Sequence, residues 1–115
     1  MKYMLFLADD GSWQQAPREE IDRMYGKIGE WWGRHAQAGT IVEGSQLQPR
    51  HTATTVRFNG NRPVVTDGPF IEAKESIGGY AIIKADNLDK AIEFAKSWPA
   101  GGVVEIRPVV EREGM

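Results

Sequence analysis

Residues 53–66 read ATTVRFNGNRPVVT, two β-rich runs that flank the pair Asn59-Gly60. β-branched and aromatic residues favour strands, and an Asn-Gly pair is typical of a type I′ turn, in which both central residues need positive φ. The stretch therefore predicts a hairpin of residues 53–58 and 61–66. Because Pro63 cannot donate a hydrogen bond to a neighbouring strand, we expect its strand to lie at an edge.

The chain before this hairpin predicts a strand, a helix and a second strand. Residues 2–8 are apolar at nearly every position, as in an inner strand or a strand covered on both faces. A helix is expected to begin near Pro17, which suits a first turn, and to end at Gly39. Residues 40–44 predict the next strand, and residues 45–52 a loop. The apolar stripe of the helix comprises Ile21, Met24, Tyr25, Ile28, Trp32 and His35.

The chain after the hairpin repeats that order. Residues 80–84 predict a strand, and Asp86 is expected to cap a helix that ends before Pro99. Residues 103–110 predict a final strand that lies at an edge or breaks near Arg107, because a proline lies inside it. The buried face of this second helix is expected to comprise Leu88, Ala91, Ile92 and Ala95.

With the hairpin set aside, the order is that of a ferredoxin-like βαββαβ fold of the α+β class. We expect residues 1–115 to form a single domain with an inserted β-hairpin. Two helices cover one face of such a sheet and leave the other face open. A homodimer that packs sheet on sheet would bury the apolar side chains of that open face.

The composition argues against several classes of function. The 16 acidic and 14 basic residues are spread along the chain, so it has no basic stripe for nucleic acid. The chain has no cysteine, which removes disulfides and thiolate chemistry. It also lacks a phosphate-binding glycine loop, an HExxH spacing and a Gly-x-Ser-x-Gly elbow, so we expect no cofactor and no metal. The apolar run at the N-terminus is too short for a signal peptide or a membrane span, and a cytoplasmic protein without membrane contact is expected.

Three segments carry a resemblance to a known family: VTDGPFIEAKESIGGYAII at residues 65–83, LDKAIEFAKSWP at 88–99 and VEIRPV at 104–109. They resemble the DGPF branch of the YCII-related proteins. The matching motif residues are Asp67, Gly68, Pro69, Phe70, Glu72, Lys74, Glu75, Gly78, Gly79 and Tyr80. The resemblance implies a dimeric α+β barrel with a cleft in each subunit. Related proteins include a dehydrochlorinase for which a His/Asp pair is proposed, and DGPF genes often accompany extracytoplasmic-function sigma factors.

Three residues are candidates for acid/base chemistry. Asp67 is a candidate general base, although an aspartate before Gly-Pro also commonly bonds its own turn. His51, in the predicted loop, is a candidate partner if that loop folds over the cleft. His35, on the apolar stripe, is either a catalytic group or a packed core histidine.

The candidate ligand-binding residues surround this motif and the loops. Glu75 precedes a Gly-Gly pair where a backbone can approach a ligand closely. Glu72 and Lys74 fit a solvated network better than a site. Trp13 is notable because it lies in a loop, outside the apolar stripe. The full set of candidates is Trp13, Phe70, Glu75, Tyr80 and Arg107, with Arg57 as a second choice for an anion clamp.

These residues support two hypotheses of different classes. The first is a protein that binds a small aromatic or acidic molecule in a cleft between sheet and helix, with cofactor-free proton transfer, as in an isomerase or a dehydrochlorinase-like lyase. The second is a non-catalytic ligand sensor or adaptor that associates with an extracytoplasmic-function sigma factor. Catalysis requires a titratable pair within hydrogen-bond reach, whereas an adaptor requires an exposed apolar patch.

Overall fold

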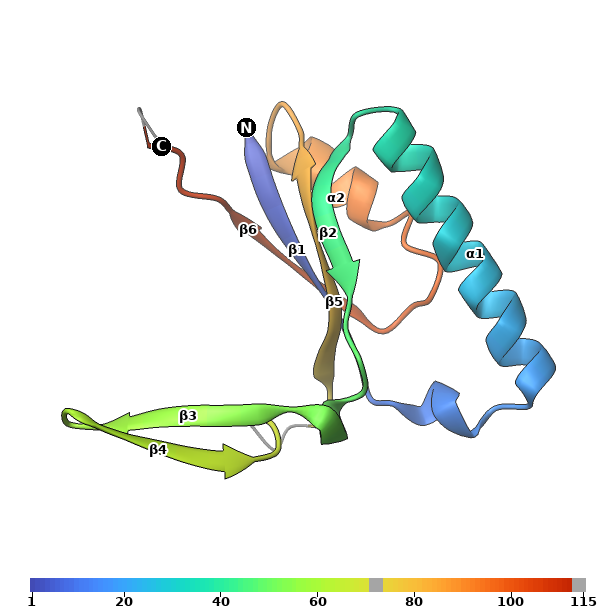
Figure 1. Cartoon of the computed structure of the whole chain (residues 1–115). Coiled ribbons are helices and arrows are strands. Elements are labelled where there is room, and N and C mark those ends of the chain that lie inside the picture. Colours follow the sequence, from blue (N-terminus) through green and yellow to red (C-terminus); the bar gives the residue numbers. More distant parts are fainter. Residues whose placement is uncertain (71–73, 113–115) are drawn as a thin grey trace.

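The computed structural model of the chain describes residues 1–70 and 74–112 (Figure 1). The fold is α+β. Its longer elements are β1 (Lys2–Asp9), α1 (Arg18–Gln37), β2 (Ile41–Gln46), β3 (Thr54–Asn59), β4 (Arg62–Asp67), β5 (Ser76–Lys84), α2 (Leu88–Ala95) and β6 (Val103–Pro108). Two short 3-10 helices, η1 (Ser12–Gln15) and η2 (Arg50–Thr52), lie in the connections.

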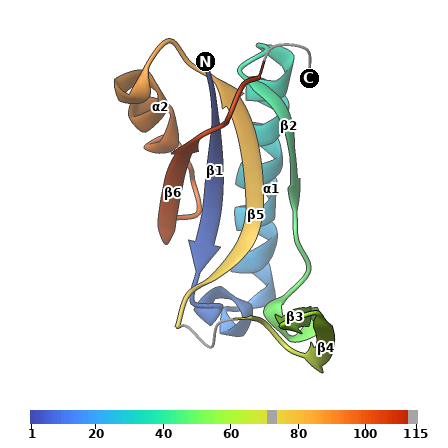
Figure 2. The ribbon, with the colours of Figure 1, turned by 90° about the vertical axis from the view of Figure 1, so that its left-hand side faces the viewer.

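The main sheet confirms the predicted ferredoxin-like fold. Within the described residues, its antiparallel strands follow the order β2-β5-β1-β6. Strand β1 is therefore an inner strand, and β6 lies at an edge, as the proline near its end predicted. Helices α1 and α2 cover one face of this sheet and leave the other face open (Figures 1 and 2).

The core lies between this sheet and the helices. Tyr3, Leu5 and Leu7 alternate along β1 and are buried, because successive strand residues point to opposite faces. Ala81 and Ile83 of the neighbouring β5 lie in the same core. Trp31 is the buried side chain of α1. The apolar stripe predicted from the sequence contained its neighbour Trp32 instead. The Trp31 indole Nε1 donates to the Ser97 hydroxyl at 2.9 Å and so links α1 to the turn that follows α2.

The β3–β4 hairpin is confirmed, but its turn differs from the prediction. Asn59 pairs with Arg62, so the two turn residues are Gly60 and Asn61. Gly60 has φ of 64°, whereas neither asparagine of the turn region has a positive φ. A positive φ at the first central residue alone, with glycine there, is the pattern of a type II′ turn. The type I′ prediction is therefore wrong, because the turn lies one residue further along the chain.

The second helix also differs in detail. Asn87, and not Asp86, is the N-cap, and its side chain accepts a hydrogen bond from the Lys90 backbone N–H at 3.0 Å. Ala91 is buried as predicted. Leu88 and Ile92, predicted for the buried face, are exposed. The eight-residue helix lies beside the edge strand β6 (Figure 2).

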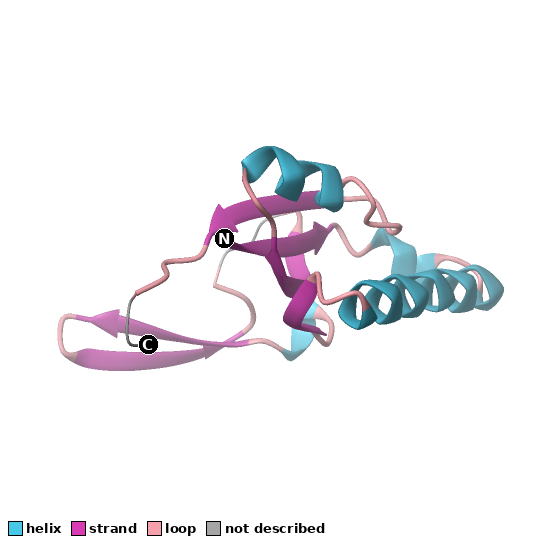
Figure 3. Cartoon of the chain, turned by 90° about the horizontal axis from the view of Figure 1, so that it is seen from above, coloured by secondary structure: helices cyan, strands magenta, loops and turns pink. Residues whose placement is uncertain are grey.

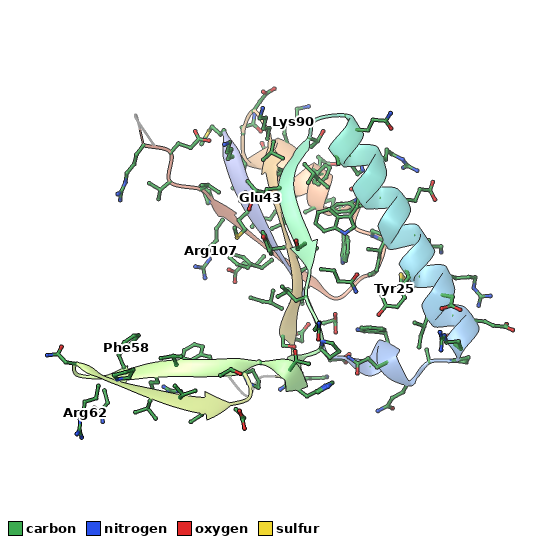
Figure 4. The ribbon with its side chains drawn as sticks, in the orientation of Figure 1. Tyr25, Glu43, Phe58, Arg62, Lys90 and Arg107 are labelled. Carbon is green, nitrogen blue, oxygen red and sulfur yellow. The ribbon has the colours of Figure 1, made fainter. Side chains whose placement is uncertain are left out.

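The hairpin extends away from the main sheet on the side opposite to the helices (Figures 1 and 3). Strands β3 and β4 form a two-stranded sheet of their own. Cross-strand partners share a face, so Val56 with Val65, and Phe58 with Pro63, form one apolar face. Figure 4 shows Phe58 and Arg62 pointing to opposite faces of this hairpin.

No helix in residues 1–70 and 74–112 is long and apolar enough to cross a membrane.

Candidate functional site

A cavity of about 410 Å³ lies between the sheet and α1, at the end of the sheet from which the hairpin leaves. Its walls come from the ends of β1 and β2, the start of β5, η1 and the inner face of α1. The aromatic side chains that line it are Trp13, Tyr25, Trp32 and Trp98. Among the polar lining residues are Asp9, Gln46, Arg50 and Ser76. A mostly apolar concavity with few polar groups is the usual form of a small-molecule site.

The α1 stripe supplies one wall of this cavity. Ile21, Met24 and Ile28 recur at helical spacing, line the cavity and are only half-buried. Tyr25 joins them from the same helix (Figure 4) and meets Trp13 edge to face, with 5.6 Å between ring centroids. The stripe was predicted as a packing face, and this part of it borders open space instead.

Of the cavity-lining residues that the structure describes, Asp9 is the one with a carboxylate. It continues the row of Tyr3, Leu5 and Leu7, so the alternation of β1 directs it toward the helix side of the sheet. Its Oδ1 accepts hydrogen bonds from the Gly11 backbone N–H at 2.8 Å and from the Trp13 indole Nε1 at 3.1 Å. These two bonds fix both the carboxylate and the Trp13 ring at the cavity wall.

A β-bulge lies beside Asp9. Leu7 pairs with Gly79 and Ala8 pairs with Ile77, which leaves Gly78 as the extra residue of β5. Bulges of this kind redirect side chains and are common next to functional sites. A Cβ atom on Gly78 would lie 3.3 Å from Asp9 Oδ2, so the glycine leaves space beside the carboxylate.

Trp32 closes another side of the cavity against β2. A Cβ atom on Gly44 would lie 2.7 Å from two atoms of the Trp32 ring. The ring therefore rests directly on the strand backbone at Gly44. Trp32 also meets the buried Trp31 edge to face, with 5.3 Å between ring centroids, which connects this wall to the core.

The structure places Asp67 and His51 at the base of the hairpin. Asp67 is exposed and is the cross-strand partner of Thr54, three residues after His51. The Gly68 N–H donates to the Ala53 carbonyl at 2.8 Å and joins the two chain segments at the base of the hairpin. Within the described residues no hydrogen bond joins the Asp67 and His51 side chains. Neither residue is among those that line the cavity.

His35 lies far from the base of the hairpin. It sits near the C-terminal end of α1, at the opposite end of the molecule from the hairpin. Its ring packs between Trp31 and Phe94, with centroid distances of 5.4 and 4.7 Å. Burial, and secondarily the charge of Arg34, lower the pKa of His35 below the ordinary 6.5. The structure does not bring His35 and Asp67 together.

The predicted ligand-binding residues are dispersed. Trp13 lines the cavity. Tyr80 pairs with Phe6 of β1, a residue between the buried Leu5 and Leu7, so Tyr80 lies on the open face. The Arg107 guanidinium lies over the Phe6 ring, 5.6 Å from its centroid, and forms a salt bridge with Glu105 at 2.7 Å on that face.

The other candidates lie near the hairpin and before β5. Phe70 is exposed, with the Arg57 guanidinium 5.5 Å from its ring centroid. Glu75, the acidic candidate, is exposed just before β5. Glu72, which was predicted to belong to a solvated network, lies outside the described residues.

Sequence reasoning identified Trp13 and missed Asp9. The predicted first strand ended at residue 8, so Asp9 fell outside it. The signal that could have found it is the period of two in residues 3, 5 and 7, which places residue 9 on the same face. The bulge at Gly78 has a weaker signal, the Gly78-Gly79 pair, because glycine in a strand often marks a bulge or a close backbone approach.

Comparison with known proteins identifies the family. The model of the YCII-related domain matches residues 1–113, so the chain belongs to the YCII-related family. The chain is also similar to an uncharacterized protein of Rhizobium meliloti (strain 1021), with 31% identity over 114 residues, 95% of this chain and 92% of the relative. The narrower assignment to the DGPF branch stays a prediction from the motif.

Proposed function

We propose that this protein binds a small organic molecule with an aromatic or other apolar body in the cavity between the sheet and α1. The observation that carries the proposal is the cavity itself. Its volume of about 410 Å³ falls in the range of ligand sites, and its aromatic walls leave few polar groups to orient a ligand.

A paired substitution on α1 tests where such a ligand binds. Ile28 lines the cavity, whereas its neighbour Lys27 is exposed and does not. We expect Ile28→Trp to fill the cavity and abolish binding, and Lys27→Trp to leave binding unchanged. Thermal-shift screening of small aromatic compounds supplies the readout, because a ligand at 100 times its Kd stabilises a protein by about 2.7 kcal/mol. Stabilisation that survives Ile28→Trp would place the ligand elsewhere.

A second candidate function is cofactor-free proton transfer at the hairpin base. The pairing of Asp67 with Thr54 supports it, because it brings the base of β4 near the segment that follows His51. No hydrogen bond joins the two side chains within the described residues, so the substrate would have to lie between them. In this reaction Asp67 removes a carbon-bound proton, the leaving group departs with its bonding electrons, and His51 protonates it. Formation of the eliminated product and of the free leaving group from a candidate substrate, followed by NMR, tests this reaction. Product formation that is undiminished in both Asp67→Asn and His51→Gln would rule out this pair.

The competing proposal is a non-catalytic sensor or adaptor that binds an extracytoplasmic-function sigma factor. It is supported by the apolar face of the hairpin, where Val56, Phe58 and Val65 are 51%, 71% and 64% exposed. Contiguous apolar surface of this kind is common at protein interfaces. In a binding assay with a purified sigma factor of this type, Phe58→Ser should weaken association. Absence of association with the unaltered protein would count against the adaptor role.

A further inference from the structure

We propose that Asp9 makes the cavity selective for ligands that carry a hydrogen-bond donor, an amine or a hydroxyl, on an aromatic body. This inference rests on the proposed function, because it names the class of molecule that the same cavity takes. Among the described residues, the charged side chains that line the cavity are Asp9 and Arg50, which have opposite signs. Their surroundings indicate which of the two governs the choice of ligand.

Asp9 is held in place before any ligand arrives. Its Oδ1 is fixed by the Gly11 N–H at 2.8 Å and by the Trp13 indole at 3.1 Å. The side chain is half-buried and belongs to β1, an inner strand of the sheet. A group already held in its binding position loses little conformational entropy when a ligand binds, so its hydrogen bond contributes more to affinity.

The second carboxylate oxygen has room beside it. Gly78 is the bulged residue of β5, and its lack of a side chain leaves open the position that a Cβ atom would fill 3.3 Å from Oδ2. A carboxylate accepts hydrogen bonds at both oxygens. Oδ2 therefore offers an acceptor site next to the cavity, and a donor-bearing ligand matches it.

The aromatic walls select the body of the same ligand. The Trp13 indole is bonded to Asp9, and the Tyr25 ring lies edge to face against Trp13, so the aromatic wall begins at the carboxylate. An aromatic body packs favourably against such rings, and a cationic amine is further attracted to their faces. The charge of Arg50, by contrast, is at the end of a long, flexible side chain. Arg50 belongs to η2, in the connection between β2 and the hairpin, so its charge is less firmly positioned than that of Asp9.

Four compounds with one phenyl ring and similar length separate these possibilities: 2-phenylethylamine, 2-phenylethanol, propylbenzene and 3-phenylpropionate. We expect 2-phenylethylamine to bind most tightly, because its ammonium group and the carboxylate are both charged. The hydroxyl of 2-phenylethanol is a neutral donor and should bind less tightly. Propylbenzene has no donor and should be weaker than the amine by about tenfold or more. Affinity is measured by the shift of the Trp13 indole signal in NMR titrations. The shift reports occupancy of this cavity directly.

Two variants assign the preference to Asp9. Asp9→Asn keeps an oxygen for the Gly11 and Trp13 bonds and removes the charge, so it should bring the amine and propylbenzene to similar affinities. Gly78→Ala keeps the charge and crowds Oδ2, and it should weaken the amine more than propylbenzene. Far-UV circular dichroism shows whether each variant folds. If Asp9→Asn does not fold, the comparison of Gly78→Ala with the unaltered protein decides the role of Asp9.

The outcomes separate this inference from the proposed function. Equal binding of all four compounds, or tightest binding of 3-phenylpropionate, would overturn the role of Asp9 and leave the cavity as a ligand site. A preference for the amine that persists in both variants would also overturn it. If none of the four compounds, nor any in the wider thermal-shift screen, bound the cavity, the proposed function would fail, and this inference with it.

Discussion

Single residues decide the shape of the cavity wall. Gly44 allows the Trp32 ring to rest on β2, Gly78 leaves space beside Asp9, and Trp13 is oriented by a hydrogen bond to that carboxylate. Each of these contacts depends on a side chain that is small or polar where a strand would ordinarily carry a larger apolar one. The cavity is therefore more sensitive to these residues than its apolar lining suggests.

The contact between Gly44 and Trp32 gives a test of this view. In Gly44→Ala the new Cβ would lie 2.7 Å from the Trp32 ring and 2.5 Å from the Tyr80 carbonyl oxygen. We expect a loss of about 1–3 kcal/mol in the free energy of unfolding, as for other overpacked sites. Urea unfolding measures it.

A matched control lies on α1. Gly29 is a helix residue, and a Cβ atom added to it would have no neighbour within 4 Å outside its own helix backbone. Gly29→Ala should therefore stabilise the protein by up to about 1 kcal/mol, because alanine has the higher helix propensity. If Gly44→Ala proved as benign as Gly29→Ala, the close packing of Trp32 on β2 would be contradicted.

His35 predicts a pH dependence of stability. Its pKa is lowered in the folded protein, first by burial and then by Arg34, so the unfolded chain binds a proton more readily. The contribution of His35 is therefore retained above about pH 6.5 and is lost as the pH falls toward the lowered pKa of the folded state. Urea unfolding between pH 8 and pH 5, values chosen to bracket the unfolded pKa of about 6.5, should show this loss in the unaltered protein. In His35→Phe, which keeps an aromatic ring and cannot titrate, the loss should be smaller, and an identical pH profile would refute the assignment.

At the level of elements, the sequence predicted what depends on local chemistry and missed what depends on pairing. The continuous apolar run of residues 2–8 predicted β1, and the helical spacing of residues 21–35 predicted α1, because both patterns are local in the sequence. The turn of the hairpin was misplaced by one residue, since Asn59-Gly60 and Gly60-Asn61 are both acceptable turn pairs and register decides between them. The cavity needed the bulge at Gly78, which arises only when β5 meets β1.

The hairpin turn carries a prediction of its own. Gly60 has a φ of 64°, so Gly60→Ala should strain the turn and lower hydrogen-exchange protection in β3 and β4. The main sheet pairs separately and should keep its protection. Asn61→Ala should have little effect, because Asn61 does not have positive φ. Equal loss of protection in both variants would indicate a type I′ turn instead.

At the scale of the whole molecule, apolar surface remains where the two helices do not reach. Met4, Phe6, Tyr80 and Ile82 are only half-buried along the open face of the sheet. The hairpin extends on that same side, and Glu43 and Arg107 also project there (Figure 4). A second copy of the chain, packed sheet on sheet, would cover this surface with the self-complementary contacts of a two-fold dimer.

Light scattering tests the dimer directly. At micromolar concentration the protein should have twice the chain mass of 12.8 kDa. Ile82→Glu places a charge in the open face and should shift the mass toward that of one chain, whereas Lys90→Glu, on the exposed side of α2, should not. A single-chain mass for the unaltered protein would rule out the dimer.

The central claim is that the cavity between the sheet and α1 binds a ligand, and the tryptophan indole signals test it most directly. Trp13, Trp32 and Trp98 line the cavity, whereas Trp31 is buried in the core and bonded to Ser97. On titration of ¹⁵N-labelled protein with 2-phenylethylamine, we predict that the Trp13 indole signal shifts most and that the Trp31 signal shifts least. Saturable binding that leaves the Trp13, Trp32 and Trp98 signals unchanged would contradict the claim.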